Sequence, residues 1–584
     1  MIIRLAIVLT LLAAVLGAPF AFRPEPGEGG IKAGRAERLV IISPHNESIL
    51  SEFRSGFANY MRKEYGREVF IDWRQPGGTT EIARFLQSEY STRFEMLWER
   101  RSGLPFTGEI RASFQNAKLD SQVHSLTLAA AEAREEAASV SKRTAETSTK
   151  QGVVDDLTLL NRDDPATYPL AARQLFLSSD LGVGIDLFFG GGAYDFDKQA
   201  SLGNLVANDR SGDFGLAPLA AEHPDWFADD IMPATMSGEP FRDPQLRWAG
   251  TVLSAFGLCV NTDVLARLGI EEPLHRWSDL ADPRLFGQIA LADPTKSGST
   301  TKAFEMLVQE RIQTLAMERG LDEKAAVAAG WNDAMRLILK LSANARYFTD
   351  SAAKVPRDVA MGDAAVGMCI DFYGRTFTEL YQPADGSPSR IQFIMPERGT
   401  SIGADPIGML RGATSPELAH RFLEYALGPE GQKLWNFRPG TPGGPQRFAL
   451  RRPPIRKDFY SSNDPALLSD PENNPYVLAE GFTYHPEWTG PLFSPLRFLI
   501  RCVCIDGHDE LAAAWAALIE SGMPAEGVAA FEELGPLAYD QVVAELAPRL
   551  KAGGKVGEIE LARELSGYFR GHFRKIAQKE GVTH

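Results

Sequence analysis

The stretch Asp293-Pro-Thr-Lys-Ser-Gly-Ser-Thr300 decides the expected fold of this chain. It follows the apolar run 288–292, which is typical of a buried strand, and precedes 302–311, whose apolar residues recur at helical spacing. A strand, a tight turn and a helix leave unpaired backbone N–H groups at the helix start, where the helix dipole adds positive charge. Hydroxyl groups of the turn add further donors, those of Ser297, Ser299 and Thr300. The stretch predicts a cradle for an anion or carboxylate, and the alternative is that Ser299 or Thr300 only caps the helix.

Composition restricts the classes of function. The 584 residues include 44% hydrophobic and 23% charged residues, which is typical of a globular protein with a sizeable core. The net charge of −15 argues against nucleic acid as a partner and against a broad basic surface for membranes. Four cysteines are too few for a disulfide framework. Cys502 and Cys504 would share one face of a strand, but no second ligand pair stands at metal-binding spacing.

The N-terminus predicts export from the cytoplasm. Residues 1–4 carry one positive charge, residues 5–22 are uncharged and apolar, and a polar linker follows over 23–38. This pattern indicates either a cleaved signal peptide or a retained signal anchor in the inner membrane, and both alternatives stay open. The rest of the chain is expected to be periplasmic or otherwise extracytoplasmic.

The chain after residue 38 alternates between strand and helix patterns. We expect strands at 39–43 and 68–73, each followed by a helix, at 49–65 and 81–89. Such alternation with short connections favours a parallel α/β sheet, in which ligands gather at the carboxyl ends of the strands. The turns 44–48 and 76–80 should therefore face one crevice.

The sheet pattern resumes after a helix-rich insertion at about 91–180. Residues 182–189 read as a strand, and three glycines follow it, which allows close backbone approach to a ligand or merely a tight turn. The apolar run 248–261 contains Ser and Gly and suits a strand that bends between two lobes. Further strands are expected at 364–370 and 403–411, and closing helices after about 510.

Together these stretches resemble the extracytoplasmic solute-binding proteins of ABC importers, type II periplasmic binding proteins of the branch that binds ferric iron, phosphonates, polyamines or thiamine. The stretches that carry the resemblance are Leu39–Glu47, Gly182–Gly192, Trp248–Asn261, Ala290–Thr300, Val359–Arg375 and Ala404–Trp435. The resemblance implies an α/β fold with two lobes, each a sheet flanked by helices, that close on a ligand without chemistry. It also implies a membrane permease as partner and, we expect, a monomer.

The resemblance also sets the expected domains. These are a signal peptide or anchor at 1–22, a linker at 23–38, lobe 1 at 39–253 with the insertion at about 91–180, lobe 2 at 254–403, a return to lobe 1 at 404–450, and an irregular and helical extension at 451–584.

Residues of the matching turns are the expected ligand contacts. They are His45, Asn46, Glu47, Gly78, Thr79, Gly191, Gly192, Ser297, Gly298, Ser299, Thr300, Asp371 and Tyr373. Ferric binders of this branch use paired tyrosines after the strand that ends here at Ile370, and this chain has one, Tyr373. Because Fe³⁺ prefers phenolate and carboxylate oxygens, Glu47 and Tyr373 are its candidate ligands, with a companion anion in the cradle. The cradle with Arg375 suits a phosphonate or another oxyanion equally well.

Two other functions compete with solute binding for import. A membrane-anchored sensory or scaffold protein would use the same fold, with the N-terminal segment retained. An enzyme is not expected, because the sequence contains no G-x-S-x-G, no H-E-x-x-H and no P-loop lysine. No cofactor is required by this hypothesis, and Fe³⁺ enters only as cargo.

Overall fold

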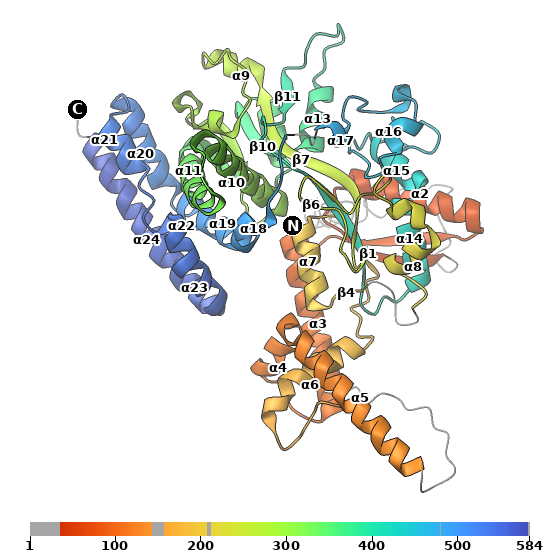
Figure 1. Ribbon diagram of the computed structural model, residues 1–584. Coiled ribbons are helices and arrows are strands. Elements are labelled where there is room, and N and C mark those ends of the chain that lie inside the picture. The colour runs from red at the N-terminus through yellow and green to blue at the C-terminus, as the bar shows by residue number, and fades with distance from the viewer. Residues whose placement is uncertain (1–35, 143–156, 207–211, 479–480, 582–584) are drawn as a thin grey trace, which may run out of the picture.

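The computed structural model describes residues 36–142, 157–206, 212–478 and 481–581 (Figure 1). The expected signal segment 1–22 lies outside the described residues, as does most of the expected linker. In the described part of the chain, no helix is both long enough and apolar enough to span a bilayer.

Lobe 1 is built on a mixed sheet. Its strand β1 (Glu37–Ile42) lies between β2 (Val69–Arg74) and β3 (Leu187–Phe189), and all three run parallel. Strand β12 (Ile402–Leu410) runs antiparallel to β3 and also pairs with the short β4 (Leu205–Val206). The strand expected over 182–189 is shorter in the structure, where only Leu187–Phe189 form β3.

Lobe 2 has a sheet of its own. Strand β8 (Ile289–Ala292) lies between β9 (Ala345–Thr349) and β10 (Val366–Ile370), again all parallel. Strand β11 (Ile391–Ile394) pairs elsewhere in the same lobe, with β7.

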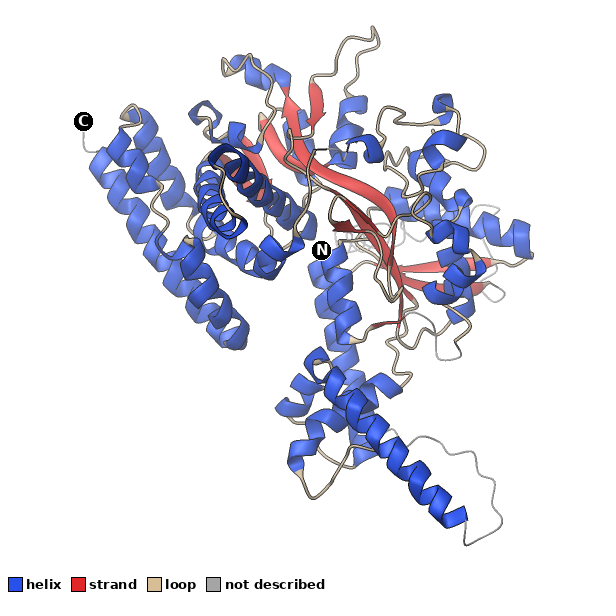
Figure 2. Ribbon diagram, viewed as in Figure 1, coloured by secondary structure: helices blue, strands red, loops and turns tan. Residues whose placement is uncertain are grey.

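One long strand joins the two sheets. All residues of β7 (Ala249–Asn261) are buried. Its first half pairs with β12 up to Ala255, and from Phe256 onwards it pairs with β10 and β11. Figure 2 shows β7 running between the two sheets. The expected two-lobed α/β fold, with a strand crossing between lobes, is confirmed.

Helices flank both sheets. Those of lobe 1 are α2 (Glu47–Tyr65), α3 (Thr79–Ser102), α7 (Ala193–Leu202), α8 (Leu216–Glu222), α14 (Pro416–Leu427) and α15 (Pro429–Asn436). Those of lobe 2 are α9 (Thr262–Arg267), α10 (Gly298–Arg319), α11 (Glu323–Ala343), α12 (Lys354–Met361) and α13 (Asp371–Leu380). Helix α3 is much longer than the expected 81–89, because its second half becomes the base of the insertion.

The insertion forms a helical projection below lobe 1 in Figure 1. It consists of α4 (Gly108–Ser113), α5 (Asp120–Lys142) and α6 (Tyr168–Ser178). Helix α6 packs against α3, and α4 and α5 pack against α6. Phe94 of α3 stacks on Phe114 with ring centroids 4.4 Å apart, and both are wholly buried. The apolar core of the insertion is continuous with one face of the lobe 1 sheet, because the same cluster includes Val40, Ile42 and Phe188.

A C-terminal helical group packs against lobe 2. Its helices are α19 (Phe493–Ile500), α20 (His508–Glu520), α21 (Ala525–Phe531), α22 (Tyr539–Gln541), α23 (Ala547–Ala552) and α24 (Gly554–Glu580). The indole of Trp515 donates to Asn344 at 2.8 Å, and that of Trp331 donates to the Leu537 carbonyl at 3.0 Å. The prediction of a strand at Cys502 and Cys504 is wrong, because Arg501–Ile505 form a π-helical turn.

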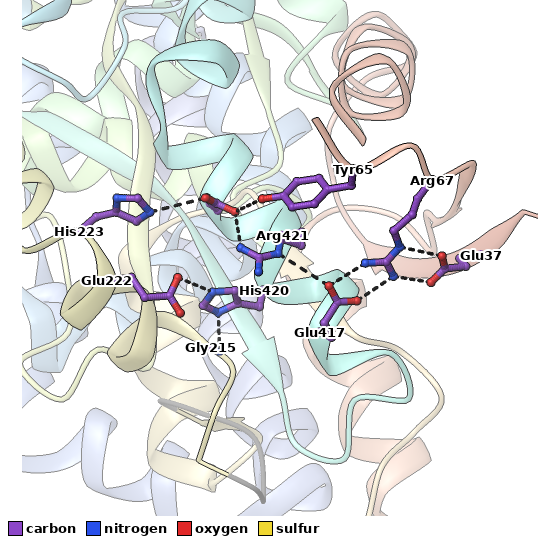
Figure 3. A network of polar contacts seen from close by, with 10 residues as sticks. Glu37, Tyr65, Arg67, Gly215, Glu222, His223, Glu417, His420 and Arg421 are labelled. Carbon is purple, nitrogen blue, oxygen red and sulfur yellow. Dashed lines mark hydrogen bonds and ion pairs between the residues drawn. The ribbon is translucent and has the colours of Figure 1, made fainter. Parts of the chain in front are cut away.

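A polar network fixes α14 to the start of β1 and the end of α2 (Figure 3). Arg67 donates to both Glu37 and Glu417, the latter at 2.7 Å. Arg421 donates to Glu424 at 2.8 Å, and His420 contacts Glu222 at 3.2 Å. Charged side chains on this outer face of lobe 1 therefore have opposite charges as partners.

Candidate functional site

The candidate site is a cavity of about 670 Å³ between the two lobes. Lobe 1 contributes the glycine turn before α7, and lobe 2 contributes the start of α10. The residues that matter to its chemistry are Gly191, Gly192, Asp195, Glu239, Gly298, Ser299, Lys302, Glu305, Asp405 and Tyr484. We refer to it as the interlobe cavity.

The glycine turn brings the start of α7 to the cavity. Gly190 and Gly191 have φ angles of +90° and +121°, which other residues rarely adopt. A Cβ at Gly190 would lie 2.3 Å from the His45 ring, so the turn packs too closely for any side chain. Helix α7 has Gly192 as its N-cap and no capping side chain. The first two residues of α7, Ala193 and Tyr194, line the cavity, and their N–H groups have no capping side chain as acceptor.

The start of α10 faces the same cavity from lobe 2. Ser297 is its N-cap and accepts from the Thr300 N–H at 3.3 Å, so the cap is neither Ser299 nor Thr300. Gly298 and Ser299 line the cavity. In the predicted turn, Ser297 therefore caps the helix, whereas Gly298 and Ser299 line the cavity.

The helix starts of the two lobes are in close proximity. A Cβ at Gly298 would lie 2.9 Å from the Thr79 hydroxyl and 3.3 Å from a carboxylate oxygen of Asp195. A Cβ at Gly78 would lie 2.9 Å from the Lys296 carbonyl. Burial raises the pKa of Asp195, against the opposing effects of Thr79 and nearby cations. The starts of α3, α7 and α10 thus converge at one edge of the cavity.

A lysine occupies the cavity wall. Lys302 lies 2.9 Å from Glu239 and 3.0 Å from Glu305, and its ammonium group stands 3.5 Å from the ring centroid of Tyr484. Burial alone would lower the pKa of Lys302, but the two carboxylates outweigh burial and raise it. The group is therefore a fixed cation with acceptors on both sides, suited to orienting polar groups of a ligand.

A buried cluster of charges lies behind the cavity. Arg452 is wholly buried and its guanidinium is 2.7 Å from Asp405, which itself lines the cavity. His45 is 3.7 Å from the same carboxylate. Burial lowers the pKa of His45, although Asp405 opposes this shift. Burial would raise the pKa of Asp405, but Arg452 and His45 outweigh it and lower the pKa.

Three other expected residues lie around this cluster. Asn46 caps α2, accepting from the Ile49 N–H at 3.1 Å, and hydrogen-bonds to Tyr373. Asp371 is buried at the start of α13 and accepts from the Phe372 N–H at 2.8 Å. Burial raises the pKa of Asp371 to about 6. These side chains support the cavity from outside its lining.

The expected contacts thus fall into three groups. Gly191, Gly192, Gly298 and Ser299 line the cavity. The second group adjoins it without lining it, and consists of His45, Asn46, Gly78, Thr79, Ser297, Thr300, Asp371 and Tyr373. Glu47 stands apart, because its side chain is 70% exposed and lies 3.5 Å from Arg54. Within the described ranges no three or more His, Cys, Asp or Glu side chains gather as a metal site.

Sequence reasoning missed the charged residues of the site. Lys302 lies only two positions beyond the expected cradle, near the start of α10, so its position carried a usable signal. Asp405 lies within a strand, where alternation alone does not distinguish a cavity residue from a structural one. Arg452 and Tyr484 come from the irregular C-terminal segments, whose sequence has no periodic pattern to place them.

Residues 217–456 match the family described as bacterial extracellular solute-binding proteins. These residues include β7, the cradle at 293–300 and β12. The match covers less than half of the chain. By that description, the members of this family act outside the cytoplasm and bind a solute.

Curated relatives match part of the chain. An uncharacterized protein of Haemophilus influenzae is 29% identical over 253 residues, 43% of this chain and 60% of that protein. The phosphoglycerate transport regulatory protein PgtC of Salmonella typhimurium is 21% identical over 182 residues, 31% of this chain and 39% of PgtC. The chain therefore spans less than two thirds of either relative.

Solved structures are similar to the chain at low identity. The periplasmic binding protein AfuA from Actinobacillus pleuropneumoniae, with fructose-6-phosphate bound, is 17% identical with a TM-score of 0.41, over 72% of this chain and 86% of AfuA. The apo ferric ion-binding protein A of Pasteurella haemolytica is 10% identical with a TM-score of 0.42, over 80% of this chain and 97% of that protein.

Proposed function

We propose that this protein captures a small solute bearing an oxyanion in the interlobe cavity and delivers it to the permease of an ABC importer. The observation that carries the proposal is that the starts of α7 and α10, from opposite lobes, line one cavity. Helix starts present N–H groups and partial positive charge, which is the environment that a phosphate or carboxylate requires.

The other cavity residues suit the remainder of such a solute. Lys302 between Glu239 and Glu305 offers one donor group and two acceptors, which can bind hydroxyls next to the anionic group. Tyr484 adds an aromatic face. A phosphorylated three-carbon acid or sugar fits this combination, and the name of PgtC, a phosphoglycerate transport regulatory protein, agrees with that class.

Ferric iron with a companion anion is the second ligand class that the resemblance implies. Its candidate ligands are already engaged, because Tyr373 is hydrogen-bonded to Asn46 and Glu47 faces Arg54. We therefore propose an oxyanion-bearing solute, in preference to ferric iron, as the ligand of the interlobe cavity.

The lobe boundaries follow as part of the proposal. Lobe 1 comprises 39–253 and 404–450, and lobe 2 comprises 254–403, with the extension beginning at 451. The support is that β7 changes its sheet partners after Ala255 and β12 begins pairing at Ile402. The hinge would then lie where these two strands are adjacent.

Isothermal titration calorimetry with phosphoglycerate, fructose 6-phosphate, inorganic phosphate and ferric citrate tests the proposal. Ser299→Asp places a negative charge at the start of α10, which stabilises a helix by about 0.3–1 kcal/mol while repelling an anion. We expect Ser299→Asp to weaken phosphoglycerate or sugar-phosphate binding at least a hundredfold, roughly 2.7 kcal/mol.

The matched control is Ser299→Asn, which changes the same side chain without adding charge and should weaken binding less than tenfold. Equal affinity of Ser299→Asp and wild type, or binding of ferric ion alone, would overturn the proposal. Circular dichroism and thermal melting of both variants establish that they fold.

A further inference from the structure

A second cavity, of about 620 Å³, lies where lobe 1, lobe 2 and the C-terminal helices meet. We call it the basic cavity. Its lining includes five cations and three carboxylates, namely Arg84, Lys296, Arg497, Arg501, Lys555, Asp293, Asp506 and Glu558. Neither Ser299 nor Lys302 lines it, so it is distinct from the interlobe cavity.

The carboxylates do not balance the cations. Asp293 accepts from the backbone and hydroxyl of Thr295, both at 2.7 Å, and Asp506 is 3.8 Å from Arg501. Across the described part of the chain, no carboxylate forms an ion pair with the other four cations, Arg84, Lys296, Arg497 and Lys555. With five cations against three carboxylates, the lining has an excess of about two positive charges at neutral pH.

A neighbouring lysine shows the effect of this excess positive charge. Burial lowers the pKa of Lys198 despite the attraction of Asp195, and the charges of Arg497 and Arg84 lower it further.

Thr80, in the first turn of α3, lines the basic cavity and is 8% exposed. Its hydroxyl has no hydrogen-bond partner among the described residues, and α3 has no capping side chain. A buried hydroxyl without a partner is costly, so its position in a cationic cavity indicates a missing ligand.

We propose that the basic cavity is a second binding site, for a phosphate-bearing small molecule with at least two negative charges. Thr80 and Arg84 of lobe 1, Lys296 of lobe 2, and Arg497 and Lys555 of the C-terminal helices would contact it together. The ligand therefore connects three parts of the chain and stabilises their arrangement. It is a regulatory or structural ligand, separate from the transported solute.

The test uses the Ser299→Asp protein, in which we expect anion binding in the interlobe cavity to be weakened, and titrates inorganic phosphate, pyrophosphate and citrate by calorimetry and thermal melting. We expect one pyrophosphate to bind per chain and to raise the melting temperature, because a ligand of the folded state stabilises it by mass action. Arg84→Gln and Lys555→Gln should each weaken this binding at least tenfold. Phosphate should bind more weakly than pyrophosphate.

The matched control is Lys551→Gln, an identical change of charge at an exposed residue of α23 outside the cavity lining, and it should change affinity less than twofold. All three lysine and arginine positions are exposed, so the variants should fold, which circular dichroism verifies. Absence of binding by all three anions, preference for citrate over pyrophosphate, or an equal loss in Lys551→Gln would overturn the proposal. The outcome is independent of whether wild type binds phosphoglycerate in the interlobe cavity.

Discussion

The buried charge cluster behind the interlobe cavity and the basic cavity use similar cations in opposite ways. Arg452 is wholly buried, lies 2.7 Å from Asp405 and stands 4.6 Å from the ring centroid of Phe372. Arg84, in contrast, is exposed and has no ion-paired carboxylate in the described part of the chain. The first cation has its counter-charge built into the fold, whereas the second does not.

This difference separates structural charge from binding charge. A cation removed from water requires an internal partner, because desolvation costs several kcal/mol that only close pairing offsets. A cation that retains contact with water has no such requirement and remains available to a ligand. Substitutions should therefore affect stability in the buried cluster and ligand affinity in the basic cavity.

The largest expected effect is on Arg452. Arg452→Met removes the guanidinium and leaves Asp405, whose side chain is 14% exposed, without its main partner, which should lower the free energy of unfolding by about 3–4 kcal/mol. Urea denaturation measures this loss. The double variant Arg452→Met with Asp405→Asn should recover at least about half of it, because no unpaired charge remains. A loss below about 1 kcal/mol in the single variant would remove the distinction between the two regions.

The next effect concerns Asp371, a buried carboxyl of the same cluster. Its pKa is raised from 3.8 to about 6, so between these values the folded state binds the proton more tightly than the unfolded state. Stability from this group is therefore present at low pH and lost as pH rises through about 6. Asp371→Asn should gain about 2 kcal/mol over wild type between pH 4 and pH 8, at 1.36 kcal/mol per pKa unit.

Urea denaturation of both proteins at several pH values gives this difference directly. His45, whose lowered pKa makes stability rise with pH below about 6.5, is present in both proteins and cancels from the comparison. A difference that stays constant with pH would show that the pKa of Asp371 is the same in the folded and unfolded states, so that burial does not raise it.

The sequence predicted the strands and helices that have periodic patterns. The cradle at 293–300 follows a buried strand and begins a helix as expected, because the apolar run and the Ser/Gly turn are local signals. The crossing strand was also predictable, since its 13 residues read as one apolar run with small residues. Glycines 191 and 192 could be placed at the cavity because strand ends and helix starts meet there.

The partners of charged side chains could not be predicted in the same way. Arg452 pairs with Asp405, which lies 47 positions earlier in the chain. Glu239 pairs with Lys302 across the lobe boundary. Such pairs depend on tertiary packing, and no periodicity encodes them. The insertion at 91–180 was recognised by composition, but the length of α3 was not. Its buried residues, from Ile82 to Trp98, pass from the lobe 1 sheet into the insertion within one continuous core, which only tertiary packing brings together.

A smaller effect is expected in the network of Figure 3, where charges are paired but partly exposed. Arg67→Met should lower the free energy of unfolding by about 1 kcal/mol, since pairs near solvent contribute little. The hydrogen bonds from Arg67 lower the pKa of Glu37 and of Glu417, so wild type loses stability as pH falls below 4.5. The variant should lose less stability over this pH range. Urea denaturation of both proteins at several pH values below 4.5 measures the difference. An identical slope in both proteins would show that solvent screening removes the interaction.

The smallest effect is expected for Arg84→Gln in buffer without multivalent anions. Removing one of several unpaired cations relieves repulsion that contributes to the lowered pKa of Lys198, so stability should change by less than about 0.5 kcal/mol or increase slightly. Adding saturating pyrophosphate should then favour wild type, because only the protein that retains Arg84 gains the full stabilisation of the bound ligand. The sign of the difference between the two proteins would therefore change on adding ligand. A loss above about 1 kcal/mol without ligand would mean that Arg84 is a structural cation like Arg452, and the contrast between paired and unpaired charge would no longer identify binding residues.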